Sequence, residues 1–455
     1  MRKEETSIQE FISSQPGEEY YAKLVEELVK LNKEFGAFNN INSAIRSGYP
    51  LSVKDNICVK GLETTASSKV LKGYVPPFDA TAVERLAEKG FGVIGKTNMD
   101  EFGFGSFGLN SENPARNPFD KNRVAGGSSS GAAIAASIID NHVALAESTG
   151  GSIAAPASFC GVVGFTPTYG VVSRYGLIDY GNSLDKIGLM ARKAAKVKYA
   201  FDIIRGKDRY DATCIDMPEG SEKKSASKKL FVIRNLLENV DEKVKKSFER
   251  TLSTLSGMGF EIEEGELKEL DSAIAVYYII AMSEASTNLA KYTGFKYGNK
   301  IDDFSKEYNE FFTEAREAFG KEAKRRIILG TYIRSASVRD RYYYKALQIR
   351  RLIGKKILEL AKRGHIVLPT MPMLPPKIED AGKMSPLQAY MVDILTVPAN
   401  LTGLPHVSFP TDYIDGLPVG TQIIGAPYDD YAILDAVDRW EEGFSYKFAY
   451  NLGSL

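Results

Sequence analysis

Two glycine–serine turns and one upstream lysine are the residues of this sequence best suited to chemistry. Ser128 follows two glycines in the run 125–131 (Ala-Gly-Gly-Ser-Ser-Ser-Gly), and Ser152 follows two more in the run 149–153 (Thr-Gly-Gly-Ser-Ile). Lys54 lies earlier, in the run 52–56 (Ser-Val-Lys-Asp-Asn). Glycine lets a backbone approach a ligand closely and point its N–H groups inward. A serine in such a turn can act as a nucleophile, with the neighbouring amides stabilising the oxyanion.

A serine needs help before it can act as a nucleophile. Its hydroxyl is a poor nucleophile until a base removes its proton. Lysine is a base only when neutral, which requires burial and neighbouring dipoles that lower its pKa.

The composition argues against several other classes of protein. The chain of 455 residues has 58 Lys+Arg and 58 Asp+Glu, so it lacks the basic excess of proteins that grip nucleic acid alone. Three separated cysteines, a charged N-terminal run and the lack of a long apolar segment predict a cytoplasmic protein without disulfides. Neither a metal site nor a histidine-dependent hydrolase is predicted, because no histidine stands at metal-ligand spacing from another histidine or cysteine: His142, His365 and His406.

The elements that must position these residues alternate between helix and strand. Helical patterns at 82–89 and 132–139 are followed by buried-strand patterns at 91–96 and 143–146, so the two glycine–serine turns flank one helix–strand unit. Alternation of this kind predicts an α/β fold with a substantially parallel sheet.

The rest of the chain has simpler patterns. Two short helices are expected within 7–35, broken near Pro16 and Gly17, and the polar run 219–229 is expected to be an exposed connector before a strand at 230–234. Helical patterns dominate 267–363. Strands are expected at 366–369 and around 405–425, with a hairpin turn at Asp415 and Gly416, before a closing helix at 429–442.

The order of the three motifs resembles that of the amidase signature family, and the resemblance runs from about residue 48 to 445. In that family the lysine is the base, the first serine is a bridge and the second serine attacks, so the resemblance gives these roles to Lys54, Ser128 and Ser152. It also implies a cis peptide bond between Gly127 and Ser128. The implied oxyanion hole consists of four backbone amides, those of Thr149, Gly150, Gly151 and Ser152.

The fold implied by the resemblance is the amidase signature fold, an α/β architecture with a central mixed, largely parallel β-sheet covered by helices on both faces. The chain is expected to form a single amidase domain over residues 1–455. Within it, residues 1–47 would supply N-terminal helices. The helix-rich segment at about 267–363 would contribute to the substrate pocket.

Further motifs resemble one branch of the family, the A subunits of tRNA-dependent glutamine amidotransferases. They lie at 62–65, 98–102, 117–120, 159–164, 172–177 and 182–185. In that branch the A subunit hydrolyses glutamine, and a B subunit uses the ammonia to amidate Glu-tRNA(Gln), Asp-tRNA(Asn) or both. The resemblance therefore implies a cytoplasmic heterotrimer with B and C subunits that serves protein biosynthesis. It implies no cofactor in this chain, ATP and magnesium being used by the partner subunit, which also holds the misacylated tRNA.

The same branch binds glutamine through a tyrosine, an arginine and an aspartate. The matching residues are Tyr277, Arg326 and Asp393, although the match leaves Tyr278 open as the tyrosine. The set is chemically suited to an amino acid, because arginine can fork onto the α-carboxylate and aspartate can pair with the α-ammonium.

Two positions depart from the family pattern. The usual run carries an aspartate two residues before Gly-Gly and an arginine two residues after the nucleophile, where this sequence has Ser148 and Ala154. Glu147 is the candidate replacement for the missing acid. These departures leave two alternatives open, a stand-alone amidase acting on another small amide and a catalytically impaired scaffold subunit.

Overall fold

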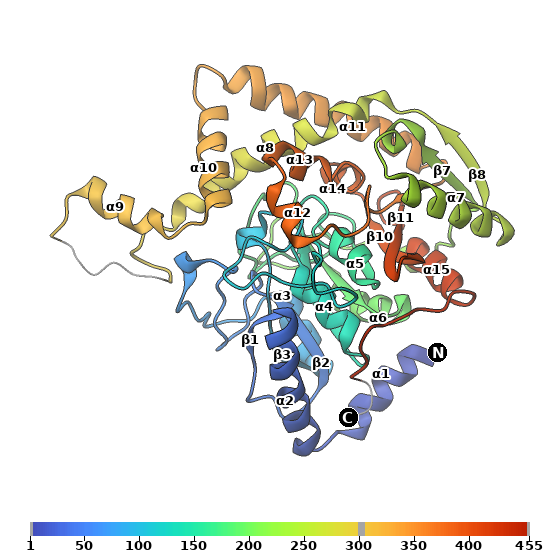
Figure 1. The fold of residues 1–455 in the computed structure, drawn as a ribbon, viewed down its shortest axis with the longest axis horizontal. Coiled ribbons are helices and arrows are strands. Elements are labelled where there is room, and N and C mark those ends of the chain that lie inside the picture. The colour runs from blue at the N-terminus through green and yellow to red at the C-terminus, as the bar shows by residue number, and fades with distance from the viewer. Residues whose placement is uncertain (1–2, 299–304, 453–455) are drawn as a thin grey trace.

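A computed structural model describes residues 3–298 and 305–452, and its strands form one sheet of eleven in the order β1-β3-β2-β4-β6-β5-β10-β11-β9-β7-β8 (Figure 1). The strands are β1 Phe38–Ile41, β2 Tyr49–Lys54, β3 Phe91–Thr97, β4 Val143–Ser148, β5 Val163–Thr166, β6 Lys186–Ala191, β7 Lys229–Ile233, β8 Glu261–Gly265, β9 His365–Pro369, β10 His406–Ile414 and β11 Leu417–Ile424.

The sheet is mixed, as predicted, but the expectation that it is largely parallel is wrong. Of the ten pairings between these strands, four are parallel and six are antiparallel. The helix–strand alternation does produce parallel neighbours locally, in the order β3-β2-β4. In the centre, however, β6 runs antiparallel to both β4 and β5, and β10 and β11 form a hairpin. The sequence pattern reports local connections and does not determine the direction of strands that join from elsewhere in the chain.

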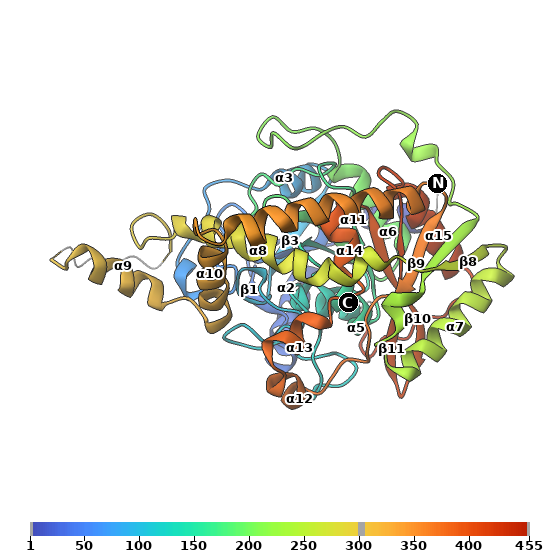
Figure 2. The same cartoon turned by 90° about the horizontal axis from the view of Figure 1, so that it is seen from above.

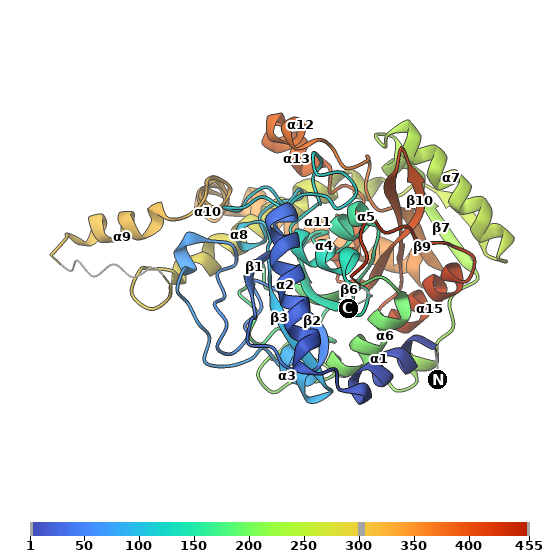
Figure 3. The same cartoon turned by 60° about the horizontal axis from the view of Figure 1, so that its bottom comes forward.

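Helices cover both faces of the sheet. Gly164 of β5 faces α5, where an added Cβ would lie 2.5 Å from the Cβ of Ala157. The next residue, Phe165, points the opposite way and packs on Phe201 of α6 with ring centroids 5.0 Å apart. Helices α4 and α5 contact each other on the first face, whereas α1, α3 and α15 contact α6 on the second. Figure 3 shows α1, α6 and α15 gathered below the sheet.

The helices are α1 Lys3–Ser14, α2 Glu18–Phe35, α3 Thr81–Glu88, α4 Ser130–Ile138, α5 Ala154–Cys160, α6 Ala194–Ile204, α7 Glu242–Gly257, α8 Ala273–Asn288, α9 Tyr308–Glu317, α10 Lys321–Ile333, α11 Lys345–Ala361, α12 Ile378–Lys383, α13 Pro386–Met391, α14 Val397–Thr402 and α15 Asp430–Glu441, with a π-helical turn at Asp340–Tyr344. Helices α8 and α11 run alongside each other, and α9 projects from the rest of the molecule (Figures 1 and 2).

Most predicted elements are confirmed to within a few residues. The segment 7–35 lies in α1 and α2, which are separated near Pro16, and the helix–strand unit corresponds to α3, β3, α4 and β4. All nine residues of α4 are buried, as expected for a helix that is apolar all round. The hairpin turn at Asp415 and Gly416 has positive φ angles of 53° and 80°, which suits a two-residue turn between twisted strands. Part of the helix-rich segment, 299–304, lies outside the described residues.

Candidate active site

Lys54 is the last residue of β2, and its side chain is fully buried. The Nζ atom lies 2.8 Å from Oγ of Ser128, 2.9 Å from the carbonyl oxygen of Glu147 and 2.9 Å from Oε2 of the same glutamate. Burial lowers the pKa of Lys54 below its ordinary value, although the Glu147 carboxylate opposes this effect. The lysine is therefore placed and tuned as a base for a serine hydroxyl.

Ser128 lies in the connection between β3 and α4, and the Gly127–Ser128 peptide bond is cis, as the family resemblance implies. The side chain of Ser128 is fully buried. The next residue, Ser129, joins the two glycine–serine turns, because its amide donates to the carbonyl of Ser152 at 3.1 Å. Its hydroxyl donates to the Glu147 carbonyl at 3.0 Å. The two turns that are separate in sequence therefore form one unit.

The turn that carries Ser152 connects β4 to α5, and both of its glycines are sterically required. A Cβ at Gly150 would lie 2.4 Å from the hydroxyl oxygen of Tyr277, and a Cβ at Gly151 would lie 2.2 Å from Oγ1 of Thr396. Gly151 also has a φ of 154°, which side chains rarely adopt. The Thr396 hydroxyl donates to the Gly150 carbonyl at 2.9 Å and so fixes the turn. Ser152 itself is 7% exposed.

Two buried carboxyl groups lie behind the lysine. Glu147 Oε1 is 2.6 Å from the hydroxyl of Thr149, and Oε2 accepts from the side-chain amide of Asn56 at 3.1 Å. The same Thr149 hydroxyl lies 2.9 Å from Oδ1 of Asp185. Burial and the nearby Glu147 charge raise the pKa of Asp185 well above its usual range. Lys54 therefore has a polar support built from β4 and the loop before β6.

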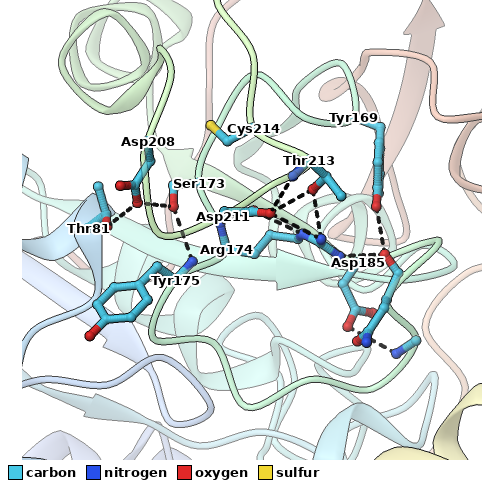
Figure 4. A network of polar contacts seen from close by, with 12 residues as sticks. Thr81, Tyr169, Ser173, Arg174, Tyr175, Asp185, Asp208, Asp211, Thr213 and Cys214 are labelled. Carbon is cyan, nitrogen blue, oxygen red and sulfur yellow. Dashed lines mark hydrogen bonds and ion pairs between the residues drawn. The ribbon is translucent and has the colours of Figure 1, made fainter.

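The loop that carries Asp185 is held by a polar network on its outer side (Figure 4). Arg174 Nε lies 3.3 Å from Oδ2 of Asp211, and the guanidinium of Arg174 also donates to the carbonyl of Asn182. The hydroxyl of Tyr169 donates to that carbonyl at 2.7 Å. Within the loop, Oδ2 of Asp185 accepts from the backbone amides of Tyr180 and Gly181, at 2.9 and 3.0 Å. This network fixes the loop and so the position of the second carboxyl group.

Arg326 of α10 is buried at 3% exposure and surrounded by aromatic rings. Its Nε donates to Oε1 of Glu322 at 2.8 Å, and its guanidinium also donates to the hydroxyl of Tyr180. A guanidinium has five N–H donors, so it can bind a carboxylate in addition to these two partners. Four rings lie with their centroids 5.0 to 5.6 Å from the guanidinium carbon, those of Phe104, Tyr180, Tyr278 and Tyr390.

Asp393, in the turn between α13 and α14, lies close to the same cluster. Its Oδ2 accepts from the hydroxyls of Ser106 and Tyr278, each at 2.8 Å. Burial raises its pKa to about 6. Tyr278 links the charged pair, because its ring lies 5.3 Å from the guanidinium carbon of Arg326. Tyr277 instead lies against Gly150, next to the turn of Ser152. Both tyrosines that the sequence left open are therefore part of the site.

The two positions that depart from the family pattern carry uncharged side chains. Ser148 is buried at the end of β4 and donates to Oδ1 of Asn400 in α14 at 3.1 Å. Ala154 begins α5 and is fully buried. The acid of this region is Glu147, one residue earlier, and it pairs directly with Lys54. A neutral hydrogen bond thus stands where the family pattern has charged residues.

Sequence reasoning foresaw only part of the rest of the site. Glu147 was the candidate replacement for the missing acid, whereas Asp185 lies in one of the motifs that resemble the family branch but had no role of its own. No pattern singled out the side chains that contact Arg326 and Asp393, because they come from separate loops and helices: Ser106, Tyr180, Glu322 and Tyr390.

The fold and the site define a protein of the amidase class. The family model described as Amidase matches residues 32–434, and the chain belongs to the amidase family. Among its relatives, the A subunit of glutamyl-tRNA(Gln) amidotransferase from Symbiobacterium thermophilum is 44% identical over 396 residues, which cover 85% of this chain and 81% of that protein. Its counterpart of the same name from Sulfurisphaera tokodaii is 42% identical and covers 92% of both chains.

A solved structure agrees with these sequence relatives. The crystal structure of the A subunit of glutamyl-tRNA(Gln) amidotransferase from Thermotoga maritima is 34% identical, with a TM-score of 0.80 over 95% of this chain and 94% of that one. Within the described residues, no group of three or more His, Cys, Asp or Glu side chains could hold a metal ion. In the same part of the chain, no helix is both long and apolar enough to cross a bilayer.

Proposed function

We propose that this chain is the glutamine-hydrolysing A subunit of a tRNA-dependent amidotransferase. The observation that carries the proposal is the buried hydrogen bond between Lys54 and Ser128, 2.8 Å long, beside the turn of Ser152. The relatives named as A subunits of glutamyl-tRNA(Gln) amidotransferase support the substrate. An impaired scaffold is disfavoured because the lysine and both serines are present, and a stand-alone amidase is disfavoured because the relatives are named as A subunits.

In the proposed reaction the Ser152 oxygen attacks the side-chain carbonyl of glutamine. The Ser152 proton passes to Ser128, whose own proton passes to neutral Lys54. The amides of Thr149, Gly150, Gly151 and Ser152 receive the oxyanion. The proton returns along the same relay to the amide nitrogen, the C–N bond breaks, and ammonia leaves. Water then hydrolyses the glutamyl ester by the same relay, which releases glutamate and restores Ser152.

The proposed glutamine pocket uses the charged pair beside this centre. Arg326 binds the α-carboxylate and Asp393 binds the α-ammonium. Tyr277 and Tyr278 line the space between them, because Tyr277 lies against Gly150 and Tyr278 hydrogen-bonds Asp393. The pocket therefore holds an amino acid by its two charges and leaves its side-chain amide for Ser152.

The partners follow from the same proposal. The ammonia is consumed on a B subunit, which holds ATP, magnesium and the misacylated tRNA, and a C subunit completes a cytoplasmic heterotrimer. The net charge of zero gives this chain no general attraction for tRNA, so the tRNA is held through the B subunit. No cofactor is assigned to this chain.

The test measures ammonia release from glutamine by the chain alone and by the chain with B and C subunits, ATP and charged tRNA. Coupling between two sites is typically worth about 1–3 kcal/mol, so the complex should be roughly 5- to 150-fold more active. The Ser152→Ala variant in the same complex gives the background. Full activity in the isolated chain, unchanged by every partner, would support a stand-alone amidase instead.

A further inference from the structure

The Nζ atom of Lys54 has three close oxygen neighbours, and two of them belong to Glu147. They are the main-chain carbonyl and the side-chain Oε2, both at 2.9 Å, and the third neighbour is Oγ of Ser128 at 2.8 Å. Both side chains of this pair are buried, with exposures of 0% and 1%. The position of Glu147 is fixed by its strand, because it pairs with Ile187 of β6.

The number of hydrogens on a neutral lysine gives these contacts a direction. A neutral amine has two N–H donors and one lone pair, and neither oxygen of Glu147 that faces Nζ can donate once the carboxyl group is ionised. The two N–H groups therefore point at Glu147. The lone pair is left pointing at Ser128, which is the orientation that proton transfer from a serine requires.

The carboxylate of Glu147 is itself held by the Thr149 hydroxyl, which lies between it and Asp185. The Thr149 hydroxyl lies 2.6 Å from Oε1 of Glu147 and 2.9 Å from Oδ1 of Asp185, yet it has only one hydrogen to donate. One of the two carboxyl groups must therefore carry a proton. Asp185 is the one that holds it, because burial and the Glu147 charge raise its pKa. Protonated Asp185 donates to Thr149, and Thr149 donates to Glu147.

We propose that Glu147 is a positioning residue that turns the lone pair of Lys54 toward Ser128, and that protonated Asp185 holds the Glu147 carboxylate through Thr149. The inference rests on the proposed function for the role of Lys54 as base. It assigns a role to the acid at position 147, which occupies a different position from the aspartate of the family pattern.

The charge of Glu147 should affect the pH dependence of activity, which a purely structural role of this side chain would not change. The acidic groups that face Lys54 are Glu147, Asp100 and Asp185. Each raises the pKa of Lys54 only while it is ionised, and Glu147 does so most, whereas burial lowers that pKa by more. Activity appears as the pH rises through the pKa of Lys54, because only the neutral amine is a base. Removal of the Glu147 charge should lower that pKa and move the acid limb of the pH profile to lower pH.

Glu147→Gln is the sharpest variant, because an amide can keep every contact. Its oxygen can accept from Lys54 and Asn56, and its nitrogen can donate to Thr149, which then donates to Asp185. We expect the acid limb of kcat, measured at saturating glutamine, to move by about one pH unit or more toward acid. Glu147→Ala should lower kcat by about 100-fold with little change in KM for glutamine, because the lone pair is no longer directed. Glu147→Asp, which keeps the charge but shortens the side chain, should keep the limb and lower the plateau.

Two assays separate this inference from the proposed function. One is glutamine hydrolysis, and the other is labelling by a fluorophosphonate, in which an O–P bond forms at Ser152, the P–F bond breaks, fluoride leaves and the proton passes through Ser128 to Lys54. Labelling requires an activated serine but no glutamine pocket. If the wild-type protein were labelled but did not hydrolyse glutamine, the proposed substrate would be wrong. The pH profile of labelling would still test the role of Glu147.

The matched control is Glu441→Gln, which removes a largely buried acid at the end of α15 that accepts from Tyr446 at 2.7 Å. It should leave both pH profiles unchanged. Thermal melting identifies the folded variants, and Glu147→Asp provides the test if Glu147→Gln does not fold. An unchanged acid limb in folded Glu147→Gln, or a wild-type plateau in folded Glu147→Asp, would overturn the proposal.

Discussion

The proposed reaction centre and the proposed glutamine pocket of this protein are assembled differently. The reaction centre is built from β2, β4 and the two glycine–serine turns, so its groups lie within about one hundred residues of one another and on the central sheet. The pocket combines α8, α10 and the turn before α14 with loops from the first half of the chain. The contrast indicates that a rigid sheet holds the atoms that react, whereas helices added around it select the substrate.

The largest expected effect lies in the reaction centre. Ser152→Ala should reduce glutamine hydrolysis to the detection limit, a loss on the order of 10⁴-fold or more, and Lys54→Ala should do almost the same. The double variant should be little worse than either single one, because members of one catalytic unit act non-additively. Lys96→Met removes a second buried lysine in the neighbouring strand and serves as the control. Substantial turnover by Ser152→Ala would show that another residue is the nucleophile.

A smaller loss is expected at the bridging serine. Ser128→Ala should lower kcat by about 10²- to 10⁴-fold, the usual contribution of a group that transfers protons, and leave more activity than Ser152→Ala. Ser130→Ala, in the same run but within α4, should change kcat little. Steady-state kinetics at saturating glutamine test both variants. Equal activity of Ser128→Ala and wild type would mean that Lys54 reaches the nucleophile without a relay.

The pocket should respond mainly through binding and less through kcat. Arg326→Ala should raise KM for glutamine roughly 30- to 4000-fold, because leaving one charge of a desolvated pair unmatched costs about 2–5 kcal/mol. Asp393→Asn should act likewise through the α-ammonium. Arg325→Ala, an exposed neighbour on the same helix, is the matched control.

Substrate analogues make the assignment specific. Wild type should strongly prefer glutamine to an analogue without the α-carboxylate, and Arg326→Ala should lose that preference. Asp393→Asn should lose the preference for the α-ammonium instead. Unchanged preferences in both variants would mean that the pocket lies elsewhere.

The smallest expected effect is a pH dependence of binding. Asp393 has a pKa of about 6, and it binds an ammonium only as a carboxylate. Its contribution is therefore present above pH 6 and is lost as the pH falls, so KM should rise by up to about tenfold per pH unit below that value. The Asp393→Asn variant should lack this rise in KM at low pH. A KM that stays constant down to pH 5 in the wild type would contradict the assignment of Asp393 to the substrate.

The sequence was informative wherever function depends on adjacent residues. The three runs around Lys54, Ser128 and Ser152 predicted which residues gather in the reaction centre only when taken together, and the family resemblance that they carry implied the cis bond. The alternation of helix and strand predicted α3 to β4, because it is a local property. Both are patterns that a short window of sequence contains.

Long-range contacts were beyond such reasoning. The direction of β6 and β10 depends on how distant segments join the sheet, and so the sheet was wrongly expected to be largely parallel. The ion pair between Lys54 and Glu147, and the ring cluster around Arg326, likewise depend on packing between segments that only the fold brings together. A buried acid in a strand carries a cost that suggests a partner, but the sequence does not identify that partner.

The hydroxyl of Thr396 joins the two regions and so has a kinetic consequence. It donates to the carbonyl of Gly150 at 2.9 Å, and the backbone amide of the same threonine donates to the carbonyl of Asp393 at 3.1 Å. A shift of Asp393 toward a bound ammonium would therefore be passed to the peptide unit between Gly150 and Gly151, whose amide belongs to the proposed oxyanion hole. A ligand without the α-ammonium should also turn over more slowly at saturation, as a smaller effect than its rise in KM.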